Sequence, residues 1–410
     1  MTRTKRDYLV YYIYFFIFIT PLNTFKSQLF ITTTLLLIGW LLTFDFKENR
    51  FIQELKKLFS FPPFLLIALF FLLNFISFLW SSNIKDWLHI QSFFKYYLII
   101  IPVLATTLTA DEAKNAFKIF LVSLTFYAIF TIMIYLGLLT VTKTPEDPFG
   151  TLAYSVATPF MVIGFFCAIV LSLYEKNQKI KYIFYMIAVM FFIAIFIQNG
   201  RAGQLAFFGT LFMLMIIYSK KLISLKSTIF VVIVVILSLS AIHFLGKDKR
   251  FIKGFNEVKL LVEKGEFKGS WGARAYVWSG AIEGVKENPF LGVGAGGNID
   301  YILEFQKNNP FYSDSTVLAT HNLHVDILFK YGIFGYTLFI GSIILLILAL
   351  SQKEEKLFGL LGVVFFSTIL FSSLGDDMLI IKPVNNVFIN IFILLSVIVI
   401  KKSPEKRLNT

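Results

Sequence analysis

The sequence predicts an all-α polytopic membrane protein with about twelve transmembrane helices. Hydrophobic residues make up 57% of the chain and charged residues 15%, with a mean hydropathy of +0.74. A soluble globular protein carries about 25% charged residues. Apolar blocks of about 17–25 residues recur along the chain, which is the length that crosses a bilayer as a helix. A transmembrane β-barrel would instead show short segments of alternating polarity.

The apolar blocks give the expected helices in chain order. We expect spans at approximately 8–24, 28–45, 62–80, 92–108, 115–138, 156–174, 182–198, 204–218, 227–245, 327–350, 357–374 and 384–400. The first block follows basic residues, as in a signal peptide, but no small-residue cleavage site follows it and a second block comes almost at once. We therefore expect it to remain as a helix.

Basic residues alternate between the short loops and set the expected orientation. One set of loops and the C-terminal end is rich in them (Lys47, Arg50, Lys56, Lys57; Lys176, Lys179, Lys181; Lys220, Lys221, Lys226; Lys353, Lys356; Lys401, Lys402, Lys406, Arg407). The other loops carry about one each: Lys26, Lys85, Lys143, Arg201, Lys382. Because basic loops stay in the cytoplasm, we expect both termini inside and the long segment 246–320 outside. The net charge of +13 then reflects this retention signal and calls for no nucleic acid.

This topology divides the chain into spans one to nine (1–245), a large outer loop (246–320) and spans ten to twelve with a cytoplasmic C-terminus (321–410). Within the loop, apolar residues recur every four positions, as on one face of a helix: Ala273, Val277, Ala281, Val285. We expect an amphipathic helix on the outer membrane surface, held by Trp271, Tyr276 and Trp278 and ended by Asn288-Pro289. Gly292 to Gly297 should form a flexible turn. It matches G-x-G-x-x-G, but no strand precedes it, so a nucleotide site is not expected.

Two arginines are candidates for binding a phosphate group. Arg201 lies between glycines in a very short outer loop, where its planar fork can contact a phosphate through two hydrogen bonds. Arg274 lies in the first turn of the expected loop helix, where free backbone N–H groups favour anions. The alternatives are an Arg201 that reaches to lipid headgroups and an Arg274 on a solvated helix face.

Ionisable side chains gather where the outer loop re-enters the membrane, which marks a functional site. His321 and His324 are one helical turn apart, so we expect both to face one side, with Asp326 on another face. A neutral imidazole can accept a proton from a hydroxyl group. The H-x-x-H spacing differs from the zinc-protease pattern, so no metal is expected. A purely structural pair of polar residues at the start of span ten is the alternative.

Asp376 and Asp377 lie in the outer loop before the last span. Paired carboxylates there could bind an acceptor hydroxyl or a divalent ion, and the alternative is a solvated turn. We treat them as possible acceptor contacts.

Together these residues resemble a known family. The chain reproduces a signature of bacterial O-antigen ligases: a histidine followed by Asn, Ser or Gln, then nine residues, a glycine, two residues, and Gly, Thr or Tyr. Here these positions are His321-Asn322, Gly332 and Gly335. The run from Arg274 through Trp278, Ala281 and Asn288-Pro289 to Gly292-Val293-Gly294 is similar to the large periplasmic loop of that superfamily. Arg201 resembles its diphosphate-contacting arginine.

The resemblance implies a glycosyltransferase of the GT-C-like type in the bacterial inner membrane, with its site facing the periplasm. It implies a glycan donor on undecaprenyl diphosphate, a sugar hydroxyl of the lipid A core as acceptor, inversion at the anomeric carbon and no cofactor. His321 would be the base or an orienting group, Arg201 and Arg274 would bind the diphosphate, and Asn322, His324, Gly332 and Gly335 would support the site. O-antigen polymerase and protein O-oligosaccharyltransferase share this layout and stay open as alternatives. A transporter of lipid-linked glycans would place charges at the bilayer midplane, whereas Lys95 and Lys118 lie near span ends.

Overall fold

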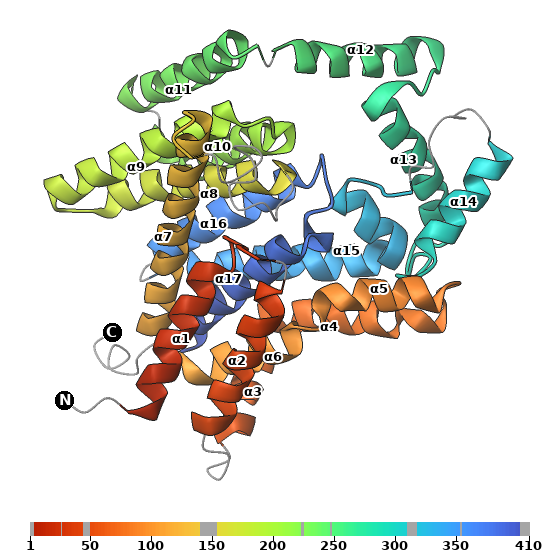
Figure 1. Cartoon of the computed structure of the whole chain (residues 1–410). Coiled ribbons are helices and arrows are strands. Elements are labelled where there is room, and N and C mark those ends of the chain that lie inside the picture. The colour runs from red at the N-terminus through yellow and green to blue at the C-terminus, as the bar shows by residue number, and fades with distance from the viewer. Residues whose placement is uncertain are drawn as a thin grey trace.

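The computed structural model describes residues 4–25, 27–43, 50–139, 154–222, 225–246, 248–309, 318–352 and 355–401. Every regular element in these ranges is a helix (Figure 1). The helices are α1 (Lys5–Ile19), α2 (Gln28–Thr43), α3 (Arg50–Phe59), α4 (Pro62–Ile76), η1 (Ser77–Leu79), α5 (Ile84–Phe94), α6 (Tyr97–Thr107), α7 (Ala110–Tyr135), α8 (Tyr154–Tyr174), α9 (Gln178–Ile197), α10 (Arg201–Leu222), α11 (Leu225–Phe244), α12 (Asp248–Lys264), α13 (Gly269–Glu287), α14 (Asn298–Asn308), α15 (Leu323–Leu350), α16 (Lys356–Ser372), η2 (Met378–Ile380) and α17 (Lys382–Ile400). The expected all-α class is confirmed.

Seven helical segments in the described ranges are long and apolar enough to cross a membrane: Pro62–Leu79, Ile84–Thr107, Ala110–Tyr135, Val156–Tyr174, Gln178–Ile197, Leu323–Leu350 and Lys382–Ile400. Four shorter apolar helices accompany them: Gln28–Thr43, Arg201–Ile217, Ile233–Phe244 and Lys356–Ser372. These eleven coincide with eleven of the expected spans, and α1 coincides with the first. The chain is thus a polytopic helical membrane protein, while the count of twelve spans stays a prediction.

Two spans form the centre of the molecule. In α8 and in α17, 83% of the apolar window is buried inside the protein, compared with 28–39% in the other candidate spans. Aromatic side chains fill the space around α17, where Phe388 stacks on Phe339 of α15 and contacts Phe366 of α16. Helices α8 and α17 are therefore surrounded by the rest of the protein over most of their apolar length.

Loops that the basic-residue pattern places on one side contact one another. Ser82, before α5, donates to Asp300 of α14 at 2.7 Å, and the Gly296 amide donates to Ser81 at 3.0 Å. On the other expected side, Lys114 of α7 pairs with Glu355 at 2.9 Å. Lys401, at the end of α17, pairs with Glu54 of α3 at 3.2 Å. These contacts agree with the alternating assignment of the loops.

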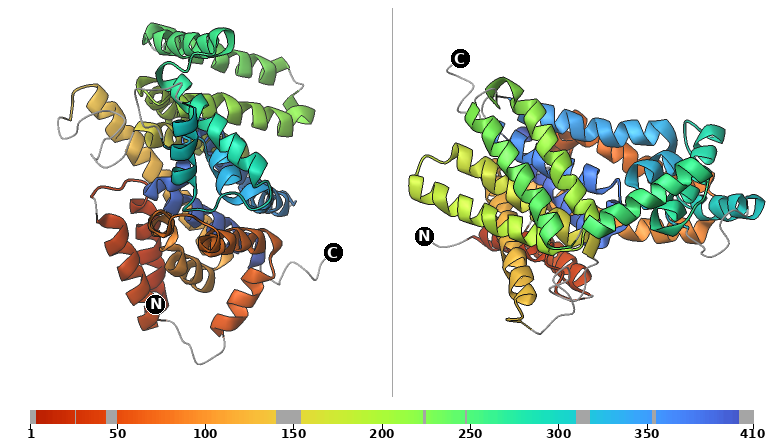
Figure 2. Two further views of the ribbon diagram at one scale, coloured as in Figure 1. Left: turned by 90° about the vertical axis from the view of Figure 1, so that its right-hand side faces the viewer. Right: turned by 90° about the horizontal axis from the view of Figure 1, so that it is seen from above.

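Helix α13 confirms the expected loop helix and its end at Asn288, but not the expected surface for its apolar face. Val277 and Ala281 are fully buried in a cluster with Ile302 of α14 and Phe329 of α15. The face that we expected to lie on the membrane is therefore covered by protein. Figures 1 and 2 place α13 and α14 beside α15, with α12 crossing above them.

The stretch from Gly292 to Gly297 is not the flexible turn that we expected. A Cβ atom at Gly292 would lie 2.5 Å from the backbone of α15 at Lys330 and Phe329. A Cβ atom at Gly296 would lie 2.0 Å from the Asn83 carbonyl oxygen. These glycines are required because the backbone of this segment packs directly against two other elements.

Candidate functional site

Helix α15 is broken near its start, at the glycine of the histidine motif. Gly332 has φ 62° and ψ −165°, outside the helical region. The break separates Ile333 and Phe334 from their usual acceptors, the carbonyl groups of Phe329 and Lys330, one turn earlier.

Segment 289–294 provides new hydrogen-bond partners for the two carbonyl groups before the break and for the two amides after it. The Val293 and Gly294 amides donate to the Phe329 and Lys330 carbonyls, each at 2.9 Å. The Ile333 amide donates to the Pro289 carbonyl at 2.8 Å, and the Phe334 amide donates to the Phe290 carbonyl at 3.3 Å. This four-bond junction attaches the end of the α13 loop to the helix that follows the histidine motif.

The motif asparagine caps the first part of α15. The Asn322 side chain accepts from the amides of His324 and Val325, at 3.0 and 3.3 Å. A side-chain acceptor at this position satisfies free N–H groups of the first helical turn. His321 precedes the cap and has φ 48°, a left-handed conformation that non-glycine residues adopt only when held there. Because His321 lies outside the helix, the expectation that it shares a helix face with His324 is wrong.

His321 is paired with one of the two candidate carboxylates. Its Nδ1 atom lies 3.2 Å from Oδ1 of Asp376, and both side chains are partly exposed, 40% and 22%. Oδ1 also accepts from the Asp377 amide at 3.0 Å, and the Leu323 amide donates to the Ser373 carbonyl. An imidazole held by a carboxylate at one nitrogen presents its other nitrogen to a reactant.

His324 bridges two helices. Its Nε2 atom lies 3.0 Å from the Leu370 carbonyl oxygen of α16, and its Nδ1 atom lies 3.1 Å from the Tyr336 hydroxyl of α15. A carbonyl oxygen only accepts, so Nε2 carries the proton and Nδ1 accepts from the tyrosine. Because both ring nitrogens are engaged within the protein, these contacts support a structural role for His324 and not a role in proton transfer.

The two candidate arginines lie near this motif. Arg201 is the first residue of α10, and a Cβ atom at Gly254 of α12 would be 3.8 Å from one of its terminal nitrogens and 2.9 Å from Nε1 of Trp271. The Arg274 guanidinium lies over the Trp271 ring, 5.8 Å from its centre. Arg201 and Arg274 therefore approach the same tryptophan from two helices.

Two further contacts connect this arginine pair to His321. Trp278, one turn after Arg274, donates its indole N–H to the Thr320 carbonyl at 2.6 Å, directly before His321. A Cβ atom at Gly375, the neighbour of Asp376, would lie 3.1 Å from Cβ of Ala202, the neighbour of Arg201. The starts of α10, α13 and α15 and the segment 373–377 thus meet at one place.

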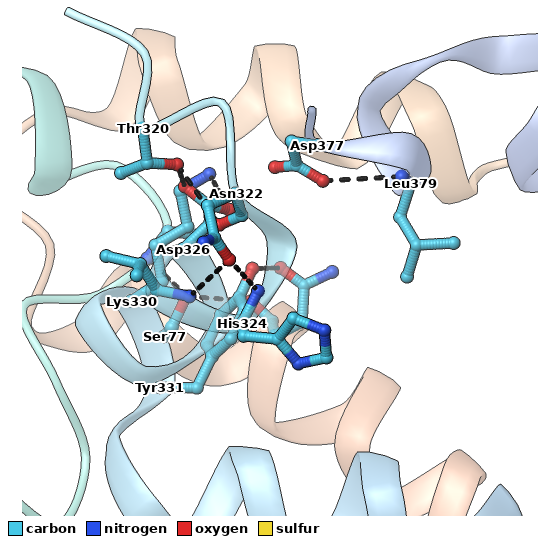
Figure 3. Close-up of polar contacts among 12 residues, drawn as sticks. Ser77, Thr320, Asn322, His324, Asp326, Lys330, Tyr331, Asp377 and Leu379 are labelled. Atoms are coloured by element: carbon cyan, nitrogen blue, oxygen red, sulfur yellow. Dashed lines mark hydrogen bonds and ion pairs between the residues drawn. The ribbon is translucent and has the colours of Figure 1, made fainter. Parts of the chain in front are cut away.

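A buried polar network lies behind the motif, and sequence reasoning missed it. Lys330 donates to Asp326 at 2.7 Å, one turn earlier on α15, and both side chains are less than 10% exposed (Figure 3). Asp377 is 2% exposed and accepts from the Leu379 amide at 3.3 Å. The i,i+4 spacing of Asp326 and Lys330 was the signal available in the sequence, because residues four apart lie on the same helix face. Opposite charges buried in an apolar helix are costly unless they form an ion pair.

Asp377 therefore differs from its neighbour. Asp376 is partly exposed beside His321, whereas the Asp377 carboxyl faces the protein interior. Burial and the nearby charge of Asp326 raise the pKa of Asp377 well above its ordinary value, against a smaller lowering of that pKa by Lys330. In the described ranges, no group of three or more His, Cys, Asp or Glu side chains is placed to hold a metal ion.

Comparison with known families agrees with the motif. Residues 186–340 match the model of the O-antigen ligase family, and no curated protein matches the chain. The matched range contains Arg201, Arg274, His321 and the broken start of α15, and it ends before Asp376. The match confirms, over residues 186–340, the resemblance drawn from the histidine motif.

Proposed function

We propose that this protein is an O-antigen ligase that transfers a glycan from undecaprenyl diphosphate to a sugar hydroxyl of the lipid A core. The observation that carries the proposal is the His321–Asp376 pair at 3.2 Å, beside two helix starts that carry arginines. His321 and both arginines lie in the stretch that matches the O-antigen ligase model. A hydroxyl nucleophile needs a base, and a leaving diphosphate needs positive charge. This place offers both.

The proposed reaction is a single displacement. With Nδ1–H donated to Asp376, Nε2 of His321 is the basic nitrogen that takes the proton from the acceptor hydroxyl. The acceptor oxygen forms a bond to the anomeric carbon while the bond from that carbon to the diphosphate oxygen breaks. Arg201 and Arg274 stabilise the charge on the departing undecaprenyl diphosphate. Attack opposite the diphosphate inverts the anomeric carbon.

Supporting roles follow from the contacts. Asn322 caps the helix behind His321, Gly332 permits the break that receives segment 289–294, and Gly335 lies in the turn after it. Asp376 contacts His321 and could also meet the acceptor hydroxyl. The proposed location is the bacterial inner membrane, with both termini in the cytoplasm and the site on the periplasmic side.

An O-antigen polymerase is the second candidate, because it would use a lipid-linked repeat as acceptor at a site of the same chemistry. The family match supports both reactions, and the banding test described next distinguishes them. A protein O-oligosaccharyltransferase would need a peptide groove next to His321, and transport would need charged residues at the bilayer midplane.

The first test is lipopolysaccharide banding in ligase-deficient cells that supply the lipid-linked O-antigen and the lipid A core. The chain should restore the high-molecular-weight bands, and His321→Ala should abolish them, since loss of a general base costs about 10²–10⁴-fold in rate. His89→Ala is the matched control, because His89 is exposed on α5 and makes an edge-to-face contact with Phe93. Absence of bands with wild-type chain in the membrane and with donor accumulated would refute the ligase.

The diphosphate clamp has its own test. Arg201→Lys and Arg274→Lys keep the charge but lose the bidentate fork, so each should slow transfer by about tenfold or more, equivalent to about 1.4 kcal/mol. The measurement is the initial rate with purified lipid-linked donor in proteoliposomes. Lys264→Arg, in the last turn of α12, is a control for changes of basic side chain. If both arginine variants transfer at the wild-type rate, the clamp assignment is wrong.

A further inference from the structure

The interior network next to the His321–Asp376 pair contains an imbalance of charge. Asp326 and Lys330 pair at 2.7 Å, and Asp377 adds a second carboxyl group to the same buried space. Thr320 and Tyr331 complete the surroundings without adding a positive charge: the Thr320 hydroxyl lies 3.4 Å from Asp326, and the Tyr331 hydroxyl donates to Asn74 at 2.7 Å. One ammonium group thus faces two carboxyl groups.

Two ionised carboxylates in a buried site are costly with a single cation to balance them. The cost disappears when one carboxyl group keeps its proton. Lys330 pairs with Asp326, whereas no cation among the described residues lies within ion-pair distance of the buried Asp377, so Asp377 is the carboxyl group that keeps the proton. The Asp326–Lys330 pair then stays ionic, and the neutral Asp377 carboxyl group accepts from the Leu379 amide.

We propose that Asp326, Lys330 and Asp377 form a buried anchor in which Asp377 keeps its proton, and that this anchor positions the His321–Asp376 pair. The three are positioning residues, and their role rests on the proposed function of His321. No covalent step is involved, and the proton stays inside the anchor during turnover.

The anchor acts on the pair from both sides. Asp377 is the neighbour of Asp376, and its amide donates to the Asp376 carboxylate at 3.0 Å. Asp326 is bonded to Thr320, the neighbour of His321, and its amide donates to the Asn322 carbonyl. Asp376 adjoins Asp377, and His321 adjoins Thr320, which is bonded to Asp326. A shift of Asp377 away from Asp326 would therefore move Asp376 and His321 apart.

The charged groups around Asp377 come from several elements. Lys330 and Asp326 face it from α15, and Asp376 and His321 lie beside it at the partly exposed end of the network. The η2 segment contributes the Leu379 amide. Among the described residues Lys330 is the single buried cation, so the proton on Asp377 is set by the interior pair and not by solvent.

The proton can be tested without any activity measurement. Infrared difference spectra of the full chain in lipid nanodiscs, with isotope-labelled aspartate, should show a protonated carboxyl group at neutral pH. Asp377→Asn should remove that band, whereas Asp111→Asn, at a side chain 92% exposed on α7, should leave it unchanged. Absence of a protonated aspartate in the wild-type protein would overturn the proposal.

The positioning role is tested by transfer kinetics, because the comparison of the Asn and Ala variants separates loss of positioning from a general loss of stability. Asparagine is the neutral isostere of a protonated aspartate, so Asp377→Asn should transfer at a rate within about threefold of wild type, with the same pH profile. Asp377→Ala should lower kcat by about tenfold or more at little change in KM, because the substrate contacts stay. Inactivity of Asp377→Asn in a folded protein would mean a carboxylate acts there directly, and would overturn the anchor.

Two measurements separate this inference from the proposed function. The chain has four histidines, so the His321 ring nitrogens can be followed by ¹⁵N NMR and assigned with His321→Ala. Asp377→Ala should shift the Nδ1 resonance of His321, and Asp377→Asn should not; an unchanged spectrum in both would overturn the positioning role. These results stand even if wild-type protein transfers no glycan, in which case only the ligase proposal fails.

A double replacement gives an independent check on the charge balance. Lys330→Met leaves two buried carboxyl groups without a cation and should destabilise the chain strongly, by about 3–5 kcal/mol. Adding Asp326→Asn removes one of those carboxylates and should recover much of the loss. Equal destabilisation of the single and double variants would contradict the shared charge.

Discussion

His324 is a residue whose neighbours, and not its spacing, identify its role. Its Nε2–H is committed to the Leu370 carbonyl and its Nδ1 to the Tyr336 hydroxyl. Tyr336→Phe removes one of these hydrogen bonds and should cost about 1 kcal/mol of unfolding free energy, with transfer rates unchanged. Thermal denaturation in detergent measures the first and the proteoliposome assay the second, with Tyr135→Phe, at an exposed ring, as control. Loss of transfer at unchanged stability would show that His324 takes part in the chemistry.

At the same scale, Asp377 predicts how stability depends on pH. Its folded pKa lies well above the ordinary value of 3.8 because of burial and the neighbouring Asp326. A raised carboxyl pKa means that the folded state holds the proton more tightly, so this contribution to stability is full below the unfolded pKa and is lost as pH rises through the folded pKa. Asp377→Asn cannot ionise and should flatten this decline. Denaturation midpoints between about pH 5 and about pH 9 measure it, and equal slopes for both proteins would contradict the assignment.

At the scale of elements, the junction between segment 289–294 and α15 depends on a glycine. Gly332 has a positive φ, and a Cβ atom there would lie 2.3 Å from the Phe290 carbonyl. Gly332→Ala should therefore destabilise the chain by about 2 kcal/mol or more and reduce transfer, because the junction holds the start of α15. Gly362→Ala on α16, where a Cβ would meet Leu395 at an ordinary 3.4 Å, is the matched control. Comparable denaturation midpoints for the two variants would refute the junction's importance.

The same elements show what the sequence could and could not predict. Hydrophobic block length located an apolar helix at each of the twelve expected positions, because that pattern is local. The break at Gly332 lies inside an unbroken apolar run, and its cause is segment 289–294, about forty residues earlier in the chain. His321 likewise sits one residue before a cap that only the Asn322 hydrogen bonds identify.

At the scale of the molecule, the candidate site joins segments that are far apart in the chain. Arg201, Arg274, His321 and Asp376 come from α10, α13, the start of α15 and the segment after α16, and only the family resemblance assigned the histidine and the arginines to one site. The residues alone could not predict their meeting, because it depends on close contacts such as Gly375 with Ala202. Asp326 and Lys330 were the opposite case, since their i,i+4 spacing is visible in the sequence but only their burial identifies their importance.

The orientation of the molecule is the last prediction, and the chain is suited to testing it. Its single cysteine, Cys167, is fully buried in α8, so the wild-type protein should resist thiol labelling and serve as its own control. Ser82→Cys, at an exposed position beside Asp300, should react with a membrane-impermeant maleimide in cells whose outer membrane alone is permeabilised. Lys176→Cys, exposed between α8 and α9, should react only after the inner membrane is opened as well. The physical reason is that lysine-rich loops are retained in the cytoplasm, which leaves the Ser82 loop, and the α14 residue bonded to it, on the periplasmic side. The reverse labelling pattern would place His321 in the cytoplasm, away from any periplasmic acceptor, and would exclude the ligase reaction for this chain.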